Sequence, residues 1–269
     1  MSREPLIDVA FTPGDVSPAQ VAVAVDVLRA SSTIVTALSR GYAQVLCCDG
    51  VERAEGLRGP GRVLAGEREC RPVPGFDCGN SPGALDPGEG RELVLSTTNG
   101  TPAILAAAAA SDEVLVGALL NLDGVVEAIP PEADVTVVCA GTDGRFALED
   151  AYAAGRLVGR LRGERTDAAH GAERLALAYS DSFEPLAECA DAAVLRETDQ
   201  ADDIVFCARE SEVETVPRVT AVSDGVATVS ALAGGATAVA GGDEGAAATV
   251  GAPGAQNRLK LIRTARSFG

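Results

Sequence analysis

Short apolar runs alternate along this chain with polar loops and helical patterns. The clearest run covers residues 135–139 and is followed by a glycine-bearing loop and by the acidic first turn of a helix that we expect over residues 146–162. The same pattern of strand, loop and helix recurs at residues 21–33 and 93–105. Such alternation from residue 20 to residue 208 is typical of the α/β fold class. If the strands are mainly parallel, their polar loops gather at one edge of the sheet.

Shorter patterns predict the remaining elements. From residue 215 onward, apolar and polar positions alternate around Asp224 and Gly225, which is typical of a β-hairpin. Residues 66–83 are rich in glycine, proline and charge, and ordered loops of such length are usually functional. Further strands are predicted over residues 43–49, 62–67, 92–96, 113–120 and 203–208 (DIVFCA), and further helices over residues 31–40, 51–58, 167–179 and 183–196.

The end of the chain has a different composition. Residues 233–255 are nearly all glycine, alanine, threonine and valine, which is too uniform to specify a packed unit. The terminal stretch NRLKLIRTARSF is cationic and amphipathic, and we expect it to dock as a helix rather than to bind a membrane. We therefore divide the chain into an α/β domain over residues 1–221 and a Gly/Ala-rich extension over residues 222–269, packed on that domain or flexible beside it.

Charge and composition exclude several classes of partner. The formal net charge of −17 argues against nucleic acid, because binding to phosphates rests on clustered lysine and arginine. The longest apolar run is too short to span a bilayer, and no basic-then-apolar leader opens the chain. We therefore expect a cytoplasmic protein that binds neither nucleic acid nor a membrane, and a homodimer is plausible from base rates alone.

Rare residue types exclude several chemistries. Lys260 is the only lysine, so the chain has no P-loop and a Schiff-base lysine is improbable. His170 is the only histidine, which disfavours histidine-rich zinc sites and Ser-His-Asp catalysis. The seven cysteines include no C-x-x-C pair and fit neither a disulfide scaffold nor a zinc site. No G-x-G-x-x-G follows a strand, which disfavours a nicotinamide dehydrogenase.

Charged residues follow several predicted strands. The carboxylates are Asp26, Glu67, Glu149 and Asp150, and the neighbouring cations are Arg29, Arg68 and Arg145. Helix N-termini and arginines attract an anion, carboxylates beside an anion usually need a cation between them, and hard oxygen ligands select Mg²⁺. Phosphoryl transfer by metal and arginine clamping is the natural hypothesis. The structural alternatives stay open: Asp26 as a helix cap, the two acids as partners of a helix dipole, the arginines as counter-charges, and TTNGT as a plain turn.

Cys139 and Arg145 have the C-x5-R spacing of cysteine-dependent phosphatases. The acid Asp143 lies between them and would repel both a thiolate and a phosphate. A small residue that ends a strand is therefore the commoner interpretation of Cys139.

Five motifs in order give a more specific indication. They are DVLRASSTIVTAL, GER, GFDCGNSP, TTNGT and CAGTDGRFALEDAYAAG, and together with DIVFCA and a later Val-Pro they span residues 20–217. In these motifs the chain resembles the 2-phosphosulfolactate phosphatase family. The resemblance implies a three-layer α/β/α fold and a Mg²⁺-dependent phosphatase that converts 2-phosphosulfolactate to sulfolactate and phosphate, a step of coenzyme M synthesis in archaeal methanogens.

The resemblance also implies a set of site residues, whose individual roles are inferences. We expect catalytic roles for Asp26, Arg29, Glu67, Arg68 and Arg145, substrate contacts from Asn80, Ser81, Thr98, Asn99, Gly100, Thr101, Gly141 and Thr142, and Mg²⁺ ligands among Asp26, Glu149 and Asp150. The nucleophile is either a metal-bound water or Asp26 itself. The chain departs from the family at Glu69 and Cys70, where a small residue often follows GER, and this bears on substrate specificity. The alternative function is a non-catalytic domain that binds a small anion or a nucleotide.

Overall fold

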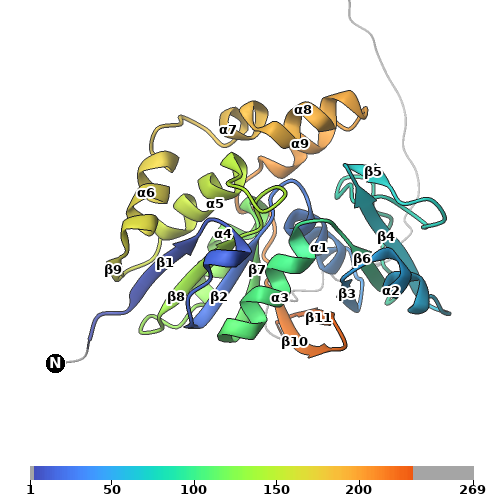
Figure 1. Cartoon of the computed structure of the whole chain (residues 1–269), viewed down its shortest axis with the longest axis horizontal. Coiled ribbons are helices and arrows are strands. Elements are labelled where there is room, and N and C mark those ends of the chain that lie inside the picture. Colours follow the sequence, from blue (N-terminus) through green and yellow to red (C-terminus); the bar gives the residue numbers. More distant parts are fainter. Residues whose placement is uncertain (1–2, 233–269) are drawn as a thin grey trace, which may run out of the picture. The chain divides into compact units, whose positions relative to one another are not determined.

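The computed structural model describes residues 3–232. Within these residues, eleven strands form one mixed sheet in the order β5-β4-β6-β3-β11-β10-β7-β2-β8-β1-β9 (Figure 1). The strands are β1 (Leu6–Ala10), β2 (Ala19–Val25), β3 (Gln44–Cys48), β4 (Arg62–Arg68), β5 (Arg71–Pro72), β6 (Glu92–Ser96), β7 (Ser111–Gly117), β8 (Val135–Cys139), β9 (Glu164–Arg165), β10 (Pro217–Ser223) and β11 (Val226–Ala231). The helices are α1 (Ala30–Ser39), α2 (Val51–Gly56), α3 (Gly100–Ala110), α4 (Leu122–Ala128), α5 (Leu148–Val158), α6 (Asp167–Ala176), α7 (Phe183–Glu188), α8 (Ala190–Glu197) and α9 (Asp202–Cys207), with 3-10 turns η1 (Pro13–Asp15) and η2 (Leu119–Asn121).

The sheet consists of two parallel blocks that run in opposite directions. One block contains β4, β6 and β3, and the other contains β7, β2, β8, β1 and β9. The antiparallel hairpin β10–β11 joins them, because β11 pairs with β3 and β10 pairs with β7. Adjacent strands twist by roughly 20 to 25°, so the rotation between β4 and β2 accumulates to more than about a right angle. Because of this rotation, the carboxyl ends of the two oppositely directed blocks point toward the same region. Segments that follow strands of both blocks line one pocket there.

Helices cover both faces of this sheet. On one face, Ala22 and Ala24 of β2 pack with Ile34 of α1 and Ile104 of α3. On the other face, Val23 of the same strand belongs to a core that includes residues of α4, α5 and α6. A smaller core beneath α2 covers β3, β4 and β6. Strands buried on both faces read as continuous apolar runs, which is why the sequence revealed them. The predicted α/β class and its three layers are confirmed.

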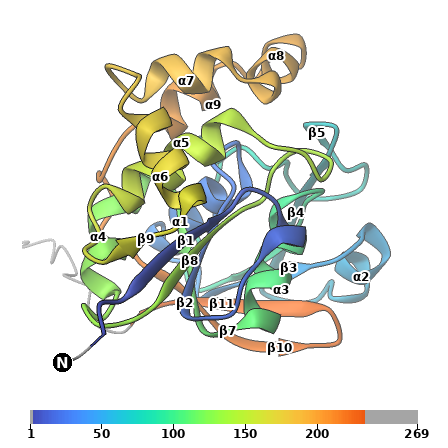
Figure 2. The same ribbon diagram turned by 60° about the vertical axis from the view of Figure 1, so that its left-hand side comes forward.

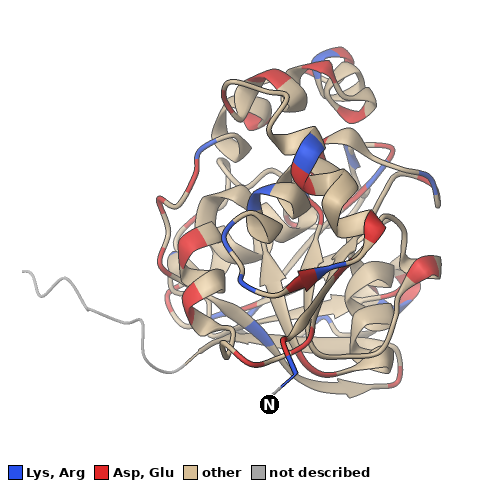
Figure 3. Cartoon of the chain, turned by 90° about the vertical axis from the view of Figure 1, so that its left-hand side faces the viewer, with Lys and Arg blue, Asp and Glu red and all other residues tan. Residues whose placement is uncertain are grey.

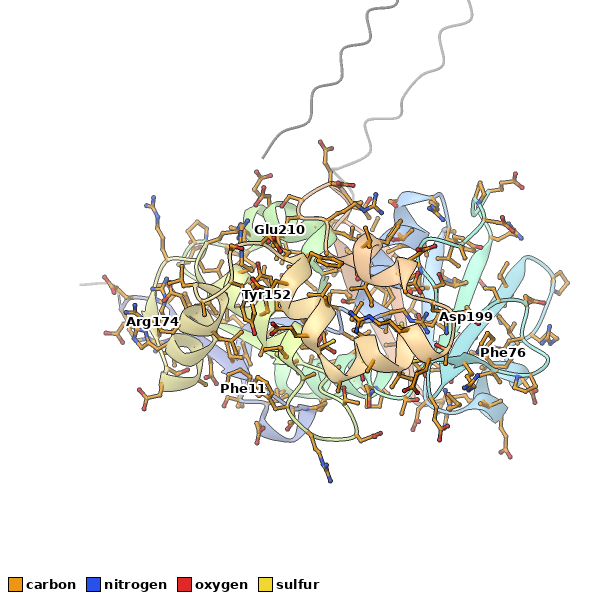
Figure 4. All side chains as sticks on the ribbon, turned by 90° about the horizontal axis from the view of Figure 1, so that it is seen from above. Phe11, Phe76, Tyr152, Arg174, Asp199 and Glu210 are labelled. Atoms are coloured by element: carbon orange, nitrogen blue, oxygen red, sulfur yellow. The ribbon has the colours of Figure 1, made fainter. Side chains whose placement is uncertain are left out.

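Helices α7, α8 and α9 lie at the pocket end of the sheet, next to α5 (Figures 1 and 2). Leu195 of α8 belongs to the same core as Val27, which follows β2. The hydroxyl of Tyr152 in α5 lies 3.0 Å from Ser182 Oγ, and Ser182 also donates a hydrogen bond to Glu210 (Figure 4). These contacts fix α7–α9 over the loops that follow β2 and β4.

Charged residues are spread over the surface. Figure 3 shows acidic and basic positions interspersed on the face that contains β1 and α6. Arg165 of β9 pairs there with Glu173 of α6 at 3.2 Å. Partly exposed pairs of this kind contribute about 0 to 1 kcal/mol each, so they adjust the surface rather than determine the fold.

The structure corrects several predicted elements. DIVFCA forms helix α9, so its prediction as a core strand was wrong. Ile204 and Cys207 are buried whereas Val205 is 59% exposed, and burial at a spacing of three indicates a helix. A six-residue apolar run is compatible with either element. Strand β1 was not predicted, helix α5 is shorter than the predicted 146–162, and the predicted helix over 183–196 is two helices, α7 and α8.

The predicted hairpin at Asp224 and Gly225 is confirmed, and it alters the domain assignment. Its second strand, β11, was placed in the extension over residues 222–269, but it pairs with β3 and β10 inside the main sheet. The rest of that extension, including the Gly/Ala-rich stretch and the cationic end, lies outside the described residues. Across residues 3–232, no helix is long and apolar enough to cross a membrane.

Candidate active site

The segments that follow β2, β4, β6 and β8 surround a pocket of about 500 Å³, with α8 on one side. This is the edge at which α/β proteins bind ligands. The predicted site residues that line it are Asp26, Arg29, Glu67, Arg68, Asn80, Thr98, Asn99 and Thr142. The structure therefore brings together side chains from all five motifs.

Asp26 directly follows β2 and is buried in the wall of the pocket. Its Oδ1 accepts a hydrogen bond from the backbone N–H of Ala30 at 3.0 Å, at the start of α1. Its Oδ2 has no hydrogen-bond partner among the described residues. A Cβ at Gly100 would lie 2.6 Å from this Oδ2 and 2.4 Å from Ala30 Cβ, so α3 can approach only because residue 100 is glycine. Asp26 thus caps the start of α1 with Oδ1, and its Oδ2 remains available to a ligand in the pocket.

Glu149 and Asp150 lie in the first turn of α5 and are buried, and neither is among the residues that line the pocket. Asp150 accepts hydrogen bonds from the backbone N–H of Val27 at 2.8 Å and of Gly141 at 3.0 Å. It therefore ties the loop after β2 to the loop after β8. A position in a helix's first turn is favourable for any acid, but the two backbone bonds give Asp150 a more specific role.

Asp191 in the first turn of α8 lines the pocket and was not predicted from the sequence. Its Oδ2 accepts a hydrogen bond from Thr142 Oγ1 at 3.0 Å. Acidic residues are common in the first turn of any helix because they interact favourably with the helix dipole, so the sequence gives no further indication of a site at Asp191. Only the fold shows that this helix end faces the loops after β4 and β8.

Asp26, Glu149, Asp150 and Asp191, which we call the acidic cluster, all have raised pKa values. Burial is the main cause for each. The negative charge of Asp150 further raises the pKa of Asp26, and Asp191 helps to raise the pKa of Glu149 to about 8. Ionising all four carboxyl groups together is therefore unfavourable, and a bound cation would favour their ionised forms.

Glu67 at the end of β4 holds two loops in place. Its Oε1 accepts a hydrogen bond from the backbone N–H of Thr98 at 2.8 Å, and its Oε2 accepts one from that of Cys70 at 3.0 Å. Glu67 is 8% exposed. Both carboxylate oxygens are thus occupied by backbone donors, which suits a residue that shapes the pocket.

The two arginines that line the pocket are held differently. Arg68 is half-buried and donates from Nη2 to Ser96 Oγ at 3.0 Å and from Nη1 to Ser96 O at 3.2 Å. Arg29 is buried and donates from Nη1 to Asp203 Oδ2 at 2.6 Å. Asp203 belongs to DIVFCA, which forms helix α9. The sequence prediction of a core strand there did not place Asp203 beside Arg29.

Other predicted site residues form hydrogen bonds that shape the loops around the pocket. The TTNGT loop is capped internally, since Thr97 Oγ1 accepts a hydrogen bond from the N–H of Thr101 at 3.2 Å. Asn99 Oδ1 accepts one from the N–H of Asp143 at 3.2 Å and so joins the loops after β6 and β8. Ser81 donates to Asp203 rather than lining the pocket. These positions keep their predicted substrate roles only as predictions.

Arg145 is exposed and is not among the residues that line the pocket. Its backbone pairs with that of Thr142 in both directions at 3.0 Å, which closes the turn after β8. Gly141 in this turn has φ +64°, and a Cβ there would lie 2.2 Å from Arg145 O. The turn therefore requires glycine, and a clamping role for Arg145 stays a prediction.

Cys139 is buried at the end of β8 and packs in the core beneath α5. Burial, with the charges of Asp150 and Glu149, raises the pKa of its thiol well above the usual value. It is not among the residues that line the pocket. These observations favour the structural interpretation of Cys139 over a thiolate nucleophile.

Glu69 and Cys70, where the sequence departs from the family pattern, both adopt left-handed backbone, with φ of +52° and +60°. Glycine adopts this conformation without strain, which explains the usual preference for a small residue here. Both residues line the pocket. Burial raises the pKa of the Cys70 thiol to about 11, so it is protonated at neutral pH.

The pocket provides donors that suit Mg²⁺. Asp26 and Asp191 supply carboxylate oxygens, and the buried Asn80 lines the same pocket with an Oδ1 that has no hydrogen-bond partner. Within residues 3–232, no group of three or more His, Cys, Asp or Glu side chains forms a ready metal cage. Mg²⁺ commonly binds through one or two carboxylates, water and substrate phosphate, so the donor set fits this ion.

Fold and pocket together define an α/β protein with a ligand pocket at the carboxyl ends of its parallel strands, lined by carboxylates and by two arginines. The family model for 2-phosphosulpholactate phosphatase matches residues 9–221. A probable 2-phosphosulfolactate phosphatase of Thermotoga maritima is 39% identical over 216 residues, which cover 79% of this chain and 94% of the relative. Proteins of the same description from Deinococcus radiodurans (37% over 208 residues, 73% and 86% covered) and Gloeobacter violaceus (39% over 209 residues, 74% and 88% covered) are also similar. The chain belongs to the 2-phosphosulfolactate phosphatase family, a family of phosphoric monoester hydrolases, as its motifs indicated.

Proposed function

We propose that this protein hydrolyses 2-phosphosulfolactate, or a closely related phosphorylated hydroxy acid, to the free hydroxy acid and phosphate with Mg²⁺ as cofactor. The observation that carries the proposal is the free Oδ2 of Asp26, which lies beside the N-terminus of α3 in a pocket that Arg68 also lines. Family membership supplies the substrate class. In an organism that makes coenzyme M, this reaction would belong to its synthesis.

The residues divide the work of phosphate recognition. Arg68 has five N–H donors, and its contacts to Glu67 and Ser96 leave donors for an anion. The start of α3 adds the backbone N–H of Gly100, which has no hydrogen-bond partner among the described residues, and the positive end of the helix dipole. Both features favour the phosphoryl group near Asp26, and they stabilise charge that develops on its oxygens during transfer.

The acidic cluster would hold the metal. Asp26 and Asp191 are its members that line the pocket, and Glu149 and Asp150 are buried in the protein interior behind them. When bound, Mg²⁺ neutralises the carboxylates and the phosphoryl oxygens. The predicted ligand roles of Glu149 and Asp150 are thereby refined to support of the two carboxylates that face the pocket.

Phosphate release from synthetic 2-phosphosulfolactate tests this proposal. We expect release with Mg²⁺, none with excess chelator, and recovery when Mg²⁺ is restored. 2-Phospholactate, which lacks the sulfonate, measures how much that group contributes to kcat/KM. If the wild-type protein binds these esters without turnover, and if Mg²⁺ leaves their affinity unchanged, the non-catalytic anion-binding alternative replaces the proposal.

A further inference from the structure

Asp203 of α9 lies at the junction of three segments that surround the pocket. Its Oδ1 accepts a hydrogen bond from Ser81 Oγ at 2.7 Å, and its Oδ2 accepts one from Arg29 Nη1 at 2.6 Å. The side chains of Arg29 and Asp203 are 1% and 6% exposed. Ser81 belongs to the GNSP motif and Arg29 to DVLRA, so one buried carboxylate connects two motifs that are far apart in the sequence.

Gln200, just before α9, completes the arrangement. Its Oε1 accepts a hydrogen bond from Arg29 Nη1, and its Nε2 donates to Cys70 O at 2.7 Å. Arg29 Nη2 donates to the same carbonyl oxygen at 3.2 Å. The guanidinium plane of Arg29 is therefore fixed from three directions, by Asp203, Gln200 and Cys70.

These contacts leave a defined part of Arg29 for a ligand. The guanidinium has five N–H donors, and three of them are used by Gln200, Asp203 and Cys70. Arg29 lines the pocket, so the two remaining donors are those that a phosphoryl or sulfonate oxygen can use. A long arginine side chain loses considerable rotamer freedom when it binds an anion, and a support that fixes it beforehand removes that cost.

We propose that Asp203, supported by Ser81, is a positioning residue that holds Arg29 in the orientation in which it binds the anionic oxygens of the substrate. The inference rests on the proposed phosphatase function for the identity of the substrate, whereas the contacts of Arg29 and Asp203 are independent of that function. Asp203 is buried whereas Asp202 beside it in α9 is exposed, so Asp202 provides a matched control.

The test is a double-mutant cycle of Asp203→Asn and Arg29→Met, with kcat, KM and inhibition by inorganic phosphate measured for each protein. We expect Asp203→Asn to lower kcat/KM and phosphate affinity by about ten- to a hundredfold, the size of one charged hydrogen bond. In the Arg29→Met background the same change should have little further effect, because Asp203 acts through Arg29. Equal losses in both backgrounds would show a purely structural role and overturn the proposal.

Two further variants keep the test decisive. Asp202→Asn removes an exposed acid from the same helix and should leave kcat/KM unchanged. Ser81→Ala releases only one oxygen of Asp203, and we expect a smaller loss of phosphate affinity that also disappears in the Arg29→Met background. It carries the test if Asp203→Asn does not fold, and unchanged phosphate affinity in Ser81→Ala would then overturn the proposal.

Calorimetric titration with inorganic phosphate separates this inference from the proposed function. If the wild-type protein hydrolyses no phosphate ester but binds phosphate, and Asp203→Asn weakens that binding, the proposed reaction fails while the role of Asp203 stands. If the wild-type protein turns over substrate and Asp203→Asn binds phosphate equally well, the role of Asp203 fails alone. Absence of both turnover and phosphate binding overturns both.

Discussion

Two groups of buried charges lie at the same end of the sheet and are stabilised in opposite ways. In the pair formed by Arg29 and Asp203, each charge meets an opposite charge and further hydrogen-bond partners. In the acidic cluster, the carboxylates meet backbone N–H groups and one another, and their pKa values rise. Removing one partner of the compensated pair therefore lowers the stability of the folded protein. The uncompensated cluster lowers that stability while its carboxyl groups are present.

This difference indicates which group requires a cation. The charges of Arg29 and Asp203 balance each other within the chain, and the pair holds its segments at fixed positions. The cluster is incomplete until a cation arrives, which is typical of a functional site. Substitutions in the two groups should therefore change stability in opposite directions.

The largest expected effect is on turnover by Asp26→Asn. We expect kcat to fall by at least about a thousandfold, because the pocket loses the charge that orients the reacting groups. The same change should raise the melting temperature, because Asn keeps the hydrogen bond to the N–H of Ala30 and removes a carboxyl group whose pKa is raised by burial. Paired measurements of kcat and melting temperature check both signs, and a fall in both would contradict the comparison.

Asp203→Asn should have the opposite effect on stability. Breaking one partner of a buried ion pair leaves the other charge uncompensated, and we expect a loss of about 3 to 5 kcal/mol in the free energy of unfolding. Urea denaturation followed by circular dichroism measures this loss. The exposed Asp202→Asn serves as control and should stay within about 0.5 kcal/mol of the wild type.

Mg²⁺ should stabilise the protein increasingly as pH rises. The pKa of Glu149 is raised from its ordinary value of 4.5 to about 8, so between these values the folded state binds more protons than the unfolded state. Without metal, the free energy of unfolding therefore falls as pH rises through this window. A bound cation favours the ionised carboxylates and reduces that fall, with a gain of about 2.7 kcal/mol at a hundredfold excess over Kd.

This effect is measured by the melting temperature with Mg²⁺ and with chelator, at intervals of roughly one pH unit from about pH 5.5 to 8.5. The difference between the two conditions should grow with pH. A difference that is constant over this range would contradict cation binding to the acidic cluster. Ca²⁺ provides a comparison, because the same oxygen donors accept it with different geometry.

Gly100→Ala tests the close approach of α3 to Asp26. A Cβ would lie within 2.6 Å of Asp26 Oδ2 and within 2.4 Å of Ala30 Cβ, and we expect a loss of about 1 to 3 kcal/mol in stability together with lower kcat. Gly171→Ala in α6 is the matched control, since nothing lies within 4 Å of its Cβ position. That substitution should stabilise the protein by about 0.5 to 1 kcal/mol through helix propensity.

The smallest effect on activity is expected for Cys139→Ser. The thiol is buried and its pKa is raised, so we expect it to take no part in phosphoryl transfer and kcat to be unchanged. A buried hydroxyl in an apolar core should cost about 1 to 3 kcal/mol in stability. Loss of turnover in a protein that remains folded would restore the thiolate mechanism.

The sequence predicted the layers of the fold more completely than it predicted the site. Strands such as β6 and β8 are buried on both faces, and their continuous apolar runs stand out. DIVFCA has the same appearance, yet its buried positions Ile204 and Cys207 lie three residues apart, as in a helix. Periodicity over six residues does not separate these alternatives, and only the packing of Ile204 and Cys207 against the core decides.

The site shows the complementary limitation. Asp26, Glu67 and Arg68 were recognisable because they end strands within distinctive motifs. Asp191 and Asp203 carry no such signal, because first-turn acids are common on any helix. Their importance depends on where α8 and α9 lie, which long-range packing determines. Sequence reasoning finds residues attached to the sheet edge more readily than residues brought to it by later helices.

The hairpin β10–β11 has a consequence for the order of assembly during synthesis. It supplies the only strand pairing between the two parallel blocks in the part of the chain that the structure describes, yet it is built from residues 217–231. Asp26 follows β2 in one block and Glu67 lies in β4 in the other. Each residue can therefore emerge from the ribosome together with neighbouring strands of its own block. The sheet that aligns them closes only when the hairpin is inserted. A growing chain therefore contains both halves of its proposed active site well before the hairpin can join the two blocks of the sheet.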